Sequence, residues 1–171
     1  MSARPASARR RRARRRVSAL ALWAAAGCCS AAESPAPQYP DGAATFAANC
    51  ALCHGAAGAG QPALAPPLTS YPARYASQAQ GRRQLALTVL YGMFGGISVG
   101  AQKFNFKMPD FSRLDDGTLA AVLNFVVFDL AQAPSDTAPL GIAEIAAERG
   151  QSLDGAAVRE HRATVLELMG L

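Results

Sequence analysis

The sequence is poor in the residues that build zinc sites and disulfide frameworks, with four cysteines and two histidines among 171 residues. Two of the cysteines, Cys28 and Cys29, fall in a leader-like N-terminal segment. Only Cys50 and Cys53 then remain, with His161 as the one histidine outside their immediate neighbourhood. A structural zinc site usually takes four ligands from two such pairs. The composition therefore disfavours a structural zinc site.

Positive charge is scarce beyond the first 32 residues. The net charge of the whole chain is +5, but eight of its 17 Lys and Arg residues lie between Arg4 and Arg16. From Glu33 onward, nine Lys and Arg stand against 12 Asp and Glu, which leaves a net charge of −3. Nucleic-acid-binding domains carry a basic surface. This balance argues against nucleic acid as a partner.

The apolar run near the N-terminus is short. Residues 17–27 make an apolar run of 11 residues, which is too short to cross a bilayer unaided. The run follows the basic stretch over residues 9–16 and precedes several small residues, which is the order of an export signal. A disordered basic arm would not explain the apolar run. We therefore expect residues 1–32 to be an export signal.

Two processing sites compete within this segment. The small residues 30–32 suit an ordinary signal peptidase, which would leave Glu33 at the new N-terminus. Residues 25–28, Ala-Ala-Gly-Cys, resemble a lipobox, which would end the signal at residue 27 and place a lipid on Cys28. The expected product is thus either soluble or lipid-anchored to the membrane, and the sequence leaves both open.

Helical patterns dominate the rest of the chain. Residues 33–40 form a Pro-rich linker, and Asp41 has the side chain to cap a helix over residues 42–53. An irregular stretch with four prolines follows over residues 55–80. A loop of that length is unusual in a compact domain unless something other than chain packing organises it. A second helix is predicted over residues 82–93.

The clearest helical pattern begins after Asp115, the predicted N-terminal cap. Its apolar residues leave little polar surface, so this helix should be buried. They are Leu119, Val122, Leu123, Val126, Val127 and Leu130. Two more helices are predicted over residues 142–149 and 154–169. In the second, four residues are expected to share one face, namely Val158, His161, Val165 and Leu168. No segment shows a strand pattern of any length, so the predicted class is all-α.

Residues 50–54 read Cys-Ala-Leu-Cys-His, the signature of c-type haem attachment. Two residues between the cysteines let both sulfurs reach the two vinyl groups of one porphyrin. The imidazole of the next residue then points at the iron. The sequence therefore predicts one covalent haem c, bound at Cys50 and Cys53 with His54 as an axial iron ligand.

Two other uses of the cysteine pair compete with haem attachment. A thioredoxin-like dithiol opens a helix within a βαβ setting, whereas Cys50 and Cys53 come at the end of a predicted helix. A disulfide between Cys50 and Cys53 is compatible with the spacing but does not explain the histidine that follows at position 54. Haem attachment accounts for all three residues.

The chain also resembles class I c-type cytochromes from its first predicted helix to its third. Gly42 and Phe46 match the small residue and the aromatic with which the family's first helix crosses its last, and Phe125 is the natural aromatic partner. The resemblance implies a cytochrome c domain over residues 41–131 and a helical C-terminal extension over residues 132–171.

Two further segments carry the same resemblance. Pro66 and Leu68 match the proline and leucine on the histidine side of the haem. This match implies that a carbonyl near Pro66 accepts a hydrogen bond from His54 and that Leu68 packs on the ring. The Met108-Pro109 segment matches the one that supplies the family's sixth ligand, which implies that Met108 binds the iron.

A narrower resemblance comes from residues 90–97, Leu-Tyr-Gly-Met-Phe-Gly-Gly-Ile, together with the segment from Met108 to Phe111. This combination is similar to monohaem domains attached to periplasmic dehydrogenases, oxidases and reductases. It implies electron transfer with a redox protein donor and acceptor, such as a dehydrogenase, an oxidase or a reductase. With both axial positions filled by protein the iron cannot bind a substrate, so no enzymatic activity is expected, and the export signal implies a periplasmic location. Contact with a membrane would come only through a lipid at Cys28.

Several assignments stay open at this point. Met93, His161 and Met169 compete with Met108 as ligands, although Met93 and His161 fit core packing as well. If Met108 does not bind, the protein would be an open-site haem enzyme or a gas sensor.

The surroundings of the haem are also open. No tryptophan follows Trp23. Four other side chains are therefore candidates for bonding the haem propionates, namely Tyr71, Tyr75, Arg82 and Arg83. Phe106 and Phe111 are expected to shield Met108 from water.

Overall fold

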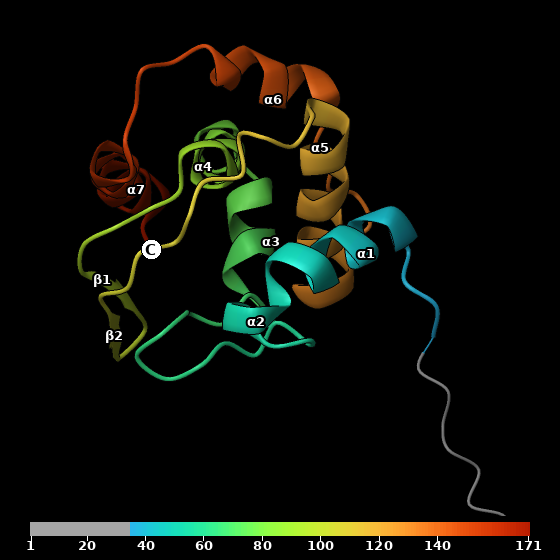
Figure 1. Ribbon diagram of the computed structural model, residues 1–171, viewed down its shortest axis with the longest axis horizontal. Helices are drawn as coiled ribbons and strands as arrows, with labels where there is room; N and C mark the ends of the chain where they lie inside the picture. Colours follow the sequence, from blue (N-terminus) through green and yellow to red (C-terminus); the bar gives the residue numbers. More distant parts are fainter. Residues whose placement is uncertain (1–34) are drawn as a thin grey trace, which may run out of the picture. The chain divides into compact units, whose positions relative to one another are not determined.

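The computed structural model describes residues 35–171, so the predicted export signal and Cys28 lie outside the described residues. Helices make up most of this part of the chain (Figure 1). In chain order they are α1 (Pro40–Asn49), α2 (Ala51–His54), α3 (Tyr71–Ala76), α4 (Ala79–Tyr91), α5 (Asp116–Asn124), the π-helical η1 (Phe125–Leu130), α6 (Ile142–Arg149) and α7 (Gly155–Met169). The predicted all-α class is confirmed. None of the helices within residues 35–171 is both long and apolar enough to cross a membrane.

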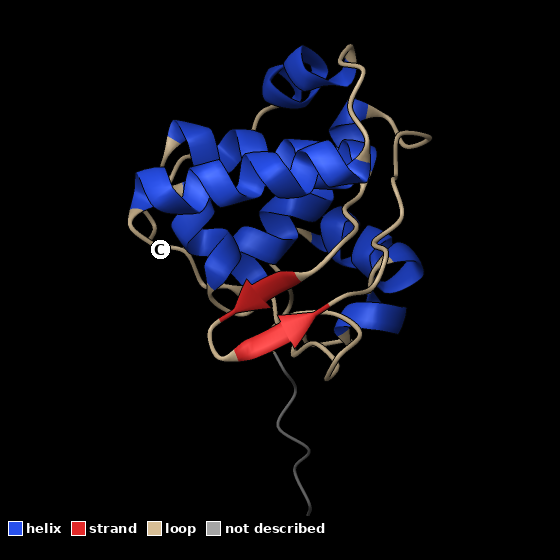
Figure 2. Cartoon of the chain, turned by 90° about the vertical axis from the view of Figure 1, so that its left-hand side faces the viewer, coloured by secondary structure: helices blue, strands red, loops and turns tan. Residues whose placement is uncertain are grey.

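A small antiparallel hairpin lies at one edge of the helices (Figure 2). It consists of β1 (Ile97–Val99) and β2 (Gln102–Phe104), with Ile97 paired to Phe104. The sequence predicted no strand here. Strands of three residues are too short to show an alternating pattern, so this hairpin could not be read from periodicity.

The crossing of α1 and α5 is close and apolar. A side chain at Gly42 would overlap the carbonyl oxygen of Ala121, so only glycine fits at the contact. One turn later, Phe46 packs against Phe125 with ring centroids 5.4 Å apart. The predicted crossing is therefore confirmed. The start of α1 is not as predicted, because the helix begins at Pro40, whose fixed φ suits the first helical turn.

Two helix boundaries differ from the sequence prediction. The stretch over residues 55–80 is not wholly irregular, because α3 forms within it with a proline in its first turn, where a missing N–H costs nothing. Helix α4 starts at Ala79, three residues before the predicted start, and ends at Tyr91, two residues before the predicted end. Gly92 follows with φ +69°, a conformation that favours glycine, and a side chain there would overlap the backbone of Met108 and Pro109.

Helix α5 is capped and buried as predicted. The Asp115 side chain accepts a hydrogen bond from the Thr118 N–H at 2.8 Å. Leu119, Val122 and Leu123 are buried among the other helices. Beyond Asn124 the helix continues as η1, so the predicted continuous helix widens in its second half.

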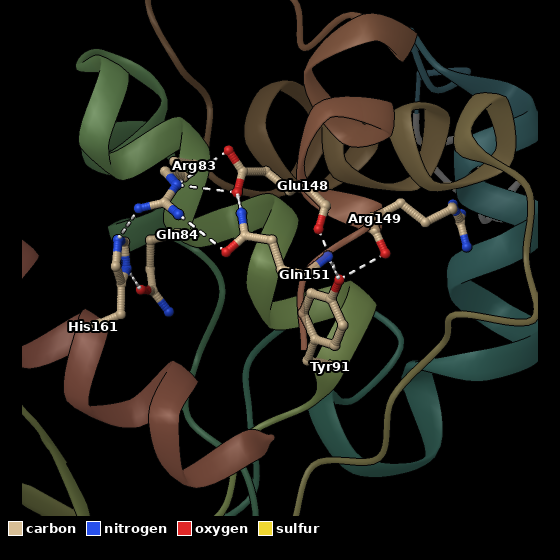
Figure 3. Close-up of polar contacts among 7 residues, drawn as sticks. All are labelled: Arg83, Gln84, Tyr91, Glu148, Arg149, Gln151 and His161. Atoms are coloured by element: carbon tan, nitrogen blue, oxygen red, sulfur yellow. Dashed lines mark hydrogen bonds and ion pairs between the residues drawn. The ribbon is translucent and has the colours of Figure 1, made fainter. Parts of the chain in front are cut away.

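The C-terminal helices pack on α4 and α5, and charged side chains tie them there. Arg82 on α4 forms two 2.7 Å hydrogen bonds with the Glu144 carboxylate on α6. Arg149 at the end of α6 binds Asp116 at 2.7 Å. Figure 3 shows a further cluster, in which Arg83 contacts Glu148 and other side chains of the extension. The extension is thus a docked part of the described structure.

The predicted helix over residues 142–149 has the predicted bounds. Helix α7 starts one residue late because Asp154 is its cap and accepts hydrogen bonds from the second and third N–H groups. The predicted face of α7 is wrong at Leu168, which is 65% exposed. Arg162 is buried on the helix instead, between Val158 and Val165.

Candidate functional site

The two cysteines of the signature lie where α1 gives way to α2. The N–H groups of Cys53 and His54 both donate to the Cys50 carbonyl, at 3.1 and 3.0 Å, so one tight turn positions all three side chains. The two thiols are not bonded to each other. Burial, with the nearby Cys53, raises the pKa of Cys50 to about 11. Catalytic dithiols lower the pKa of one cysteine, so this environment disfavours a thioredoxin-like role.

His54 is only 8% exposed and is fixed by one hydrogen bond. Its Nδ1 lies 3.0 Å from the carbonyl oxygen of Pro66, which can only accept, so Nδ1 carries the proton. Burial lowers the pKa of His54 more than this hydrogen bond raises it, which favours the neutral ring. A neutral imidazole with Nδ1 occupied offers its Nε2 lone pair to a metal.

The signature residues open onto a cavity whose lining is mainly apolar. Cys50, Cys53, His54 and Met108 all line it. Apolar side chains from every region of the domain complete its walls, among them Leu68, Val89, Ile97, Phe104, Phe111 and Val126. Pro66 also lies in the lining. The structure therefore gathers all six residues that the sequence singled out for the haem site.

The backbone of Met108 is pinned beside the end of α4. Its N–H donates to the Met93 carbonyl at 2.8 Å, and the Met93 N–H donates back to the Met108 carbonyl at 3.1 Å. Three residues on, the Phe111 N–H donates to the Val89 carbonyl at 2.8 Å. These bonds fix the loop that presents Met108 to the cavity. Met93 lines the cavity too, but it is buried in a cluster with Leu87 and Val158.

Other candidate ligands lie outside the cavity lining. His161 is bound on both ring nitrogens, with Nδ1 2.6 Å from Gln84 Oε1 and Nε2 3.1 Å from an Arg83 nitrogen. Met169 packs at the edge of the main apolar core. Both ring nitrogens of His161 thus have local partners, and the structure favours neither residue as an iron ligand.

Some predicted surroundings of the site are not favoured by the structure. Arg82 and Arg83 bind the C-terminal extension and do not line the cavity, so the structure does not favour them as propionate ligands. Phe106 and Phe111 both line the cavity, but Phe106 is 60% exposed whereas Phe111 is buried, so the structure favours Phe111 as the shield of Met108. Tyr71 and Tyr75 do line the cavity, as candidates for that role must.

Sequence reasoning missed one cavity residue, Arg162 of α7. Its signal was present in the helical period, because Arg162 follows Val158 by four residues and precedes Val165 by three. An arginine at a buried position of an amphipathic helix needs a partner. The sequence could not show that the face of α7 that carries Arg162 lies against this cavity.

The donor set fits a c-type haem. The turn supplies two unbonded thiols and an imidazole whose Nε2 is free of protein partners, and the apolar cavity they open onto suits a porphyrin face. Within residues 35–171, no three His, Cys, Asp or Glu side chains gather to hold a bare metal ion. The site therefore suits a metal held in a macrocycle better than a zinc ion.

Comparison with known proteins agrees with this geometry. The family model described as cytochrome c matches residues 39–127. The chain is 42% identical over 86 residues to cytochrome c-552 of Thermus thermophilus, covering 50% of this chain and 65% of that protein. A second cytochrome c-552 from the same organism is also 42% identical over 86 residues, which cover 57% of its length. The chain thus spans less than two thirds of the length of these relatives.

Proposed function

The chain belongs to the cytochrome c family, and we propose that it transfers electrons through one haem c whose iron is held by His54 and Met108. Cys50 and Cys53 have the spacing that binds the haem covalently. When bound, the haem supplies an iron centre that accepts and releases one electron. The chain's own residues provide the iron ligands, shield the haem from water and control the access of small molecules to the iron.

The observation that carries this proposal is the presence of His54 and Met108 in one cavity. The two residues come from segments 54 positions apart, yet each is held by its own backbone-directed bonds. The Pro66 carbonyl orients the imidazole, and the Met93 backbone anchors Met108. A histidine and a thioether as the two axial ligands favour a relatively high reduction potential.

The apolar lining supports electron transfer over catalysis. Side chains such as Leu68 and Phe111 exclude water, which limits solvent rearrangement when the charge of the site changes. With both axial positions taken by protein, no open position is left for a substrate. We therefore propose that the chain acts as a carrier or cytochrome subunit and has no enzymatic activity of its own.

Export completes the proposal. Covalent haem attachment at Cys50 and Cys53, together with the signal-like order of residues 1–32, supports action in the periplasm. The proposed partners are a redox protein donor and acceptor, such as a dehydrogenase, an oxidase or a reductase. A lipid on Cys28 would tether the chain to the membrane. Mass spectrometry of the mature N-terminus distinguishes a lipidated start at Cys28 from a start at Glu33.

The ligand assignment is tested by comparing Met108→Ala with Met93→Ala in the exported, haem-loaded protein. The unmutated protein should be low-spin in both oxidation states, bind no carbon monoxide at neutral pH and show the weak red absorption of a Met–iron bond. Met108→Ala should erase that band, admit carbon monoxide and lower the reduction potential. Met93→Ala should keep the band. A high-spin ferrous spectrum in the unmutated protein would contradict the proposal and favour an enzyme or a gas sensor.

A further inference from the structure

The most unusual charged group in the described structure is the guanidinium of Arg162. This residue of α7 is 9% exposed and lines the cavity that holds His54. Its Nη2 donates to the Ser98 carbonyl at 3.0 Å, and within residues 35–171 it forms no ion pair. A guanidinium has five N–H donors. Among the described residues, most of its donors therefore lack a hydrogen-bond acceptor and its charge lacks a carboxylate.

A buried hydroxyl group accompanies this charge. Tyr75 of α3 is 7% exposed and lines the same cavity. Its hydroxyl oxygen is enclosed, and no described residue lies within hydrogen-bond distance and angle of it. Burial raises the pKa of Tyr75, while the charge of the adjacent Arg162 guanidinium and the interaction between the two side chains offset part of that rise. A buried hydroxyl without a partner is costly, as is a buried unpaired charge.

An anionic oxygen ligand would satisfy both groups. A guanidinium pairs with a carboxylate through short, charge-assisted hydrogen bonds, and a phenol can donate a further one. A haem carries two carboxylates, its propionates, on the half of the porphyrin away from the vinyl groups that the cysteines bind. We propose that Arg162 and Tyr75 bind one haem propionate, so that the C-terminal extension completes the haem site. This inference rests on the haem site proposed above.

The rotation of α7 is fixed in a way that directs Arg162 inward. Val158 and Val165, which flank it on the helix, are 0% and 2% exposed. The adjacent His161 binds Gln84 on α4 at 2.6 Å (Figure 3). Gln84 also donates to the Val158 carbonyl at 3.4 Å. These contacts hold the helix against α4 whatever occupies the cavity.

Arg162 differs from Lys107, another charged residue at this cavity, in its burial. Lys107 lies in the cavity lining as well, but it is exposed, and an exposed ammonium keeps its hydration. The buried guanidinium of Arg162 has given up most of its water.

A positive charge beside a propionate stabilises the reduced haem site, which is the more negative one. Removing the charge of Arg162 should therefore lower the midpoint potential.

The test compares Arg162→Gln with Arg159→Gln in the exported, haem-loaded full chain. Arg159 lies one turn earlier on the same helix and does not line the cavity, so its variant loses the same charge nearby. Resonance Raman reports the propionate bending mode directly, and a redox titration gives the midpoint potential. We expect Arg162→Gln to shift the mode and lower the potential, and Arg159→Gln to leave the mode unchanged.

Two further variants keep the test decisive if Arg162→Gln does not accumulate. Arg162→Lys keeps the charge, so it should shift the mode while retaining most of the potential. Tyr75→Phe should shift the mode with little effect on the potential. A propionate mode equal to that of the unmutated protein in every Arg162 and Tyr75 variant obtained would overturn the inference and leave Arg162 as a tie to Ser98 only. The Met–iron band, read on the same samples, reports separately on the proposed ligation.

Discussion

Helix α1 packs on α5, and the pair α6–α7 packs on α4 and α5, but the two regions are attached differently. Helix α1 meets α5 through a close apolar crossing at Gly42 and Phe46. The pair α6–α7 meets α4 and α5 through ion pairs and polar contacts around a few buried apolar residues. One added carbon at such a close crossing overlaps the neighbouring helix and forces the two helices apart. In a polar network, a substitution removes only the contacts of the residue that is changed. Mutations in the two regions should therefore differ greatly in effect.

The largest effect is expected at Gly42. Gly42→Val places two methyl groups against the Ala121 carbonyl and the Phe125 side chain, so α1 must move away from α5. Overpacking typically costs about 1–3 kcal/mol and occasionally more, and an overlap with backbone atoms belongs at the upper end. Because Cys50 directly follows α1, displacement of this helix also disturbs the haem attachment site. We expect little or no soluble haem-loaded protein, measured by haem staining and absorption of periplasmic extracts.

The matched control is Ala48→Val, on the exposed side of the same helix. It carries only the lower helix propensity of valine, about 0.5 kcal/mol. Equal yields and equal thermal midpoints for Gly42→Val and Ala48→Val would show that the crossing can relax, against the proposed difference between the two regions.

A smaller effect is expected at Arg149, where α6 is tied to the start of α5. Its guanidinium donates to Asp116 at 2.7 Å and to the carbonyls of Ser112 and Leu114 at 2.6 and 2.7 Å. Arg149→Ala removes three charge-assisted bonds from a partly exposed site, so we expect a loss of about 1.5–2 kcal/mol. Denaturant titration measures it. Arg159→Ala, which loses a 3.6 Å pair with Glu160 and packing against Gly95 but none of the hydrogen bonds found among the described residues, serves as the control. Equal losses in both variants would contradict a special role for Arg149.

A weaker coupling is expected between Arg83 and Glu148. Arg83 Nε lies 3.1 and 3.0 Å from the two Glu148 oxygens, but the arginine side chain is 43% exposed. A double-mutant cycle with Arg83→Ala and Glu148→Ala should give about 0.5–1 kcal/mol of coupling. Salt should reduce this coupling because exposed charges are screened. A coupling that does not change with salt would place the pair among the buried contacts and weaken the comparison.

The features that could be predicted from the sequence are the local ones. The haem signature needs only residues 50–54, and the cap at Asp115 and the bounds of α6 follow from neighbouring side chains. The crossing at Gly42 was predictable through a family resemblance, since its partner Ala121 lies 79 positions away.

The features that were missed depend on length or on distant contacts. The hairpin strands have three residues each, which is too few for a periodic pattern. The face of α7 was misjudged because apolar Leu168 looked like a core residue and charged Arg162 did not. Only the docking of α7 beside the cavity shows why an arginine is buried there.

The smallest effect is expected from the titration of His161, which lies between α4 and α7. Burial lowers the pKa of His161 and Arg83 lowers it further, while Glu148 acts in the opposite direction. The unfolded chain should therefore bind a proton at His161 more readily than the folded chain. Stability from this group is complete above the unfolded pKa of about 6.5 and is lost as the pH falls through it.

His161→Gln tests this titration, because glutamine can still hydrogen-bond but takes up no proton in this range. Between about pH 7 and about pH 5, the thermal midpoint of the unmutated protein should fall slightly more than that of His161→Gln. Glu148→Gln, which removes the charge that opposes the shift, should make the fall steeper than in the unmutated protein. His54 and the carboxylates outside the cluster are common to all three proteins and cancel in the comparison. Parallel curves for the three would show that the contact between α4 and α7 does not depend on the protonation of His161.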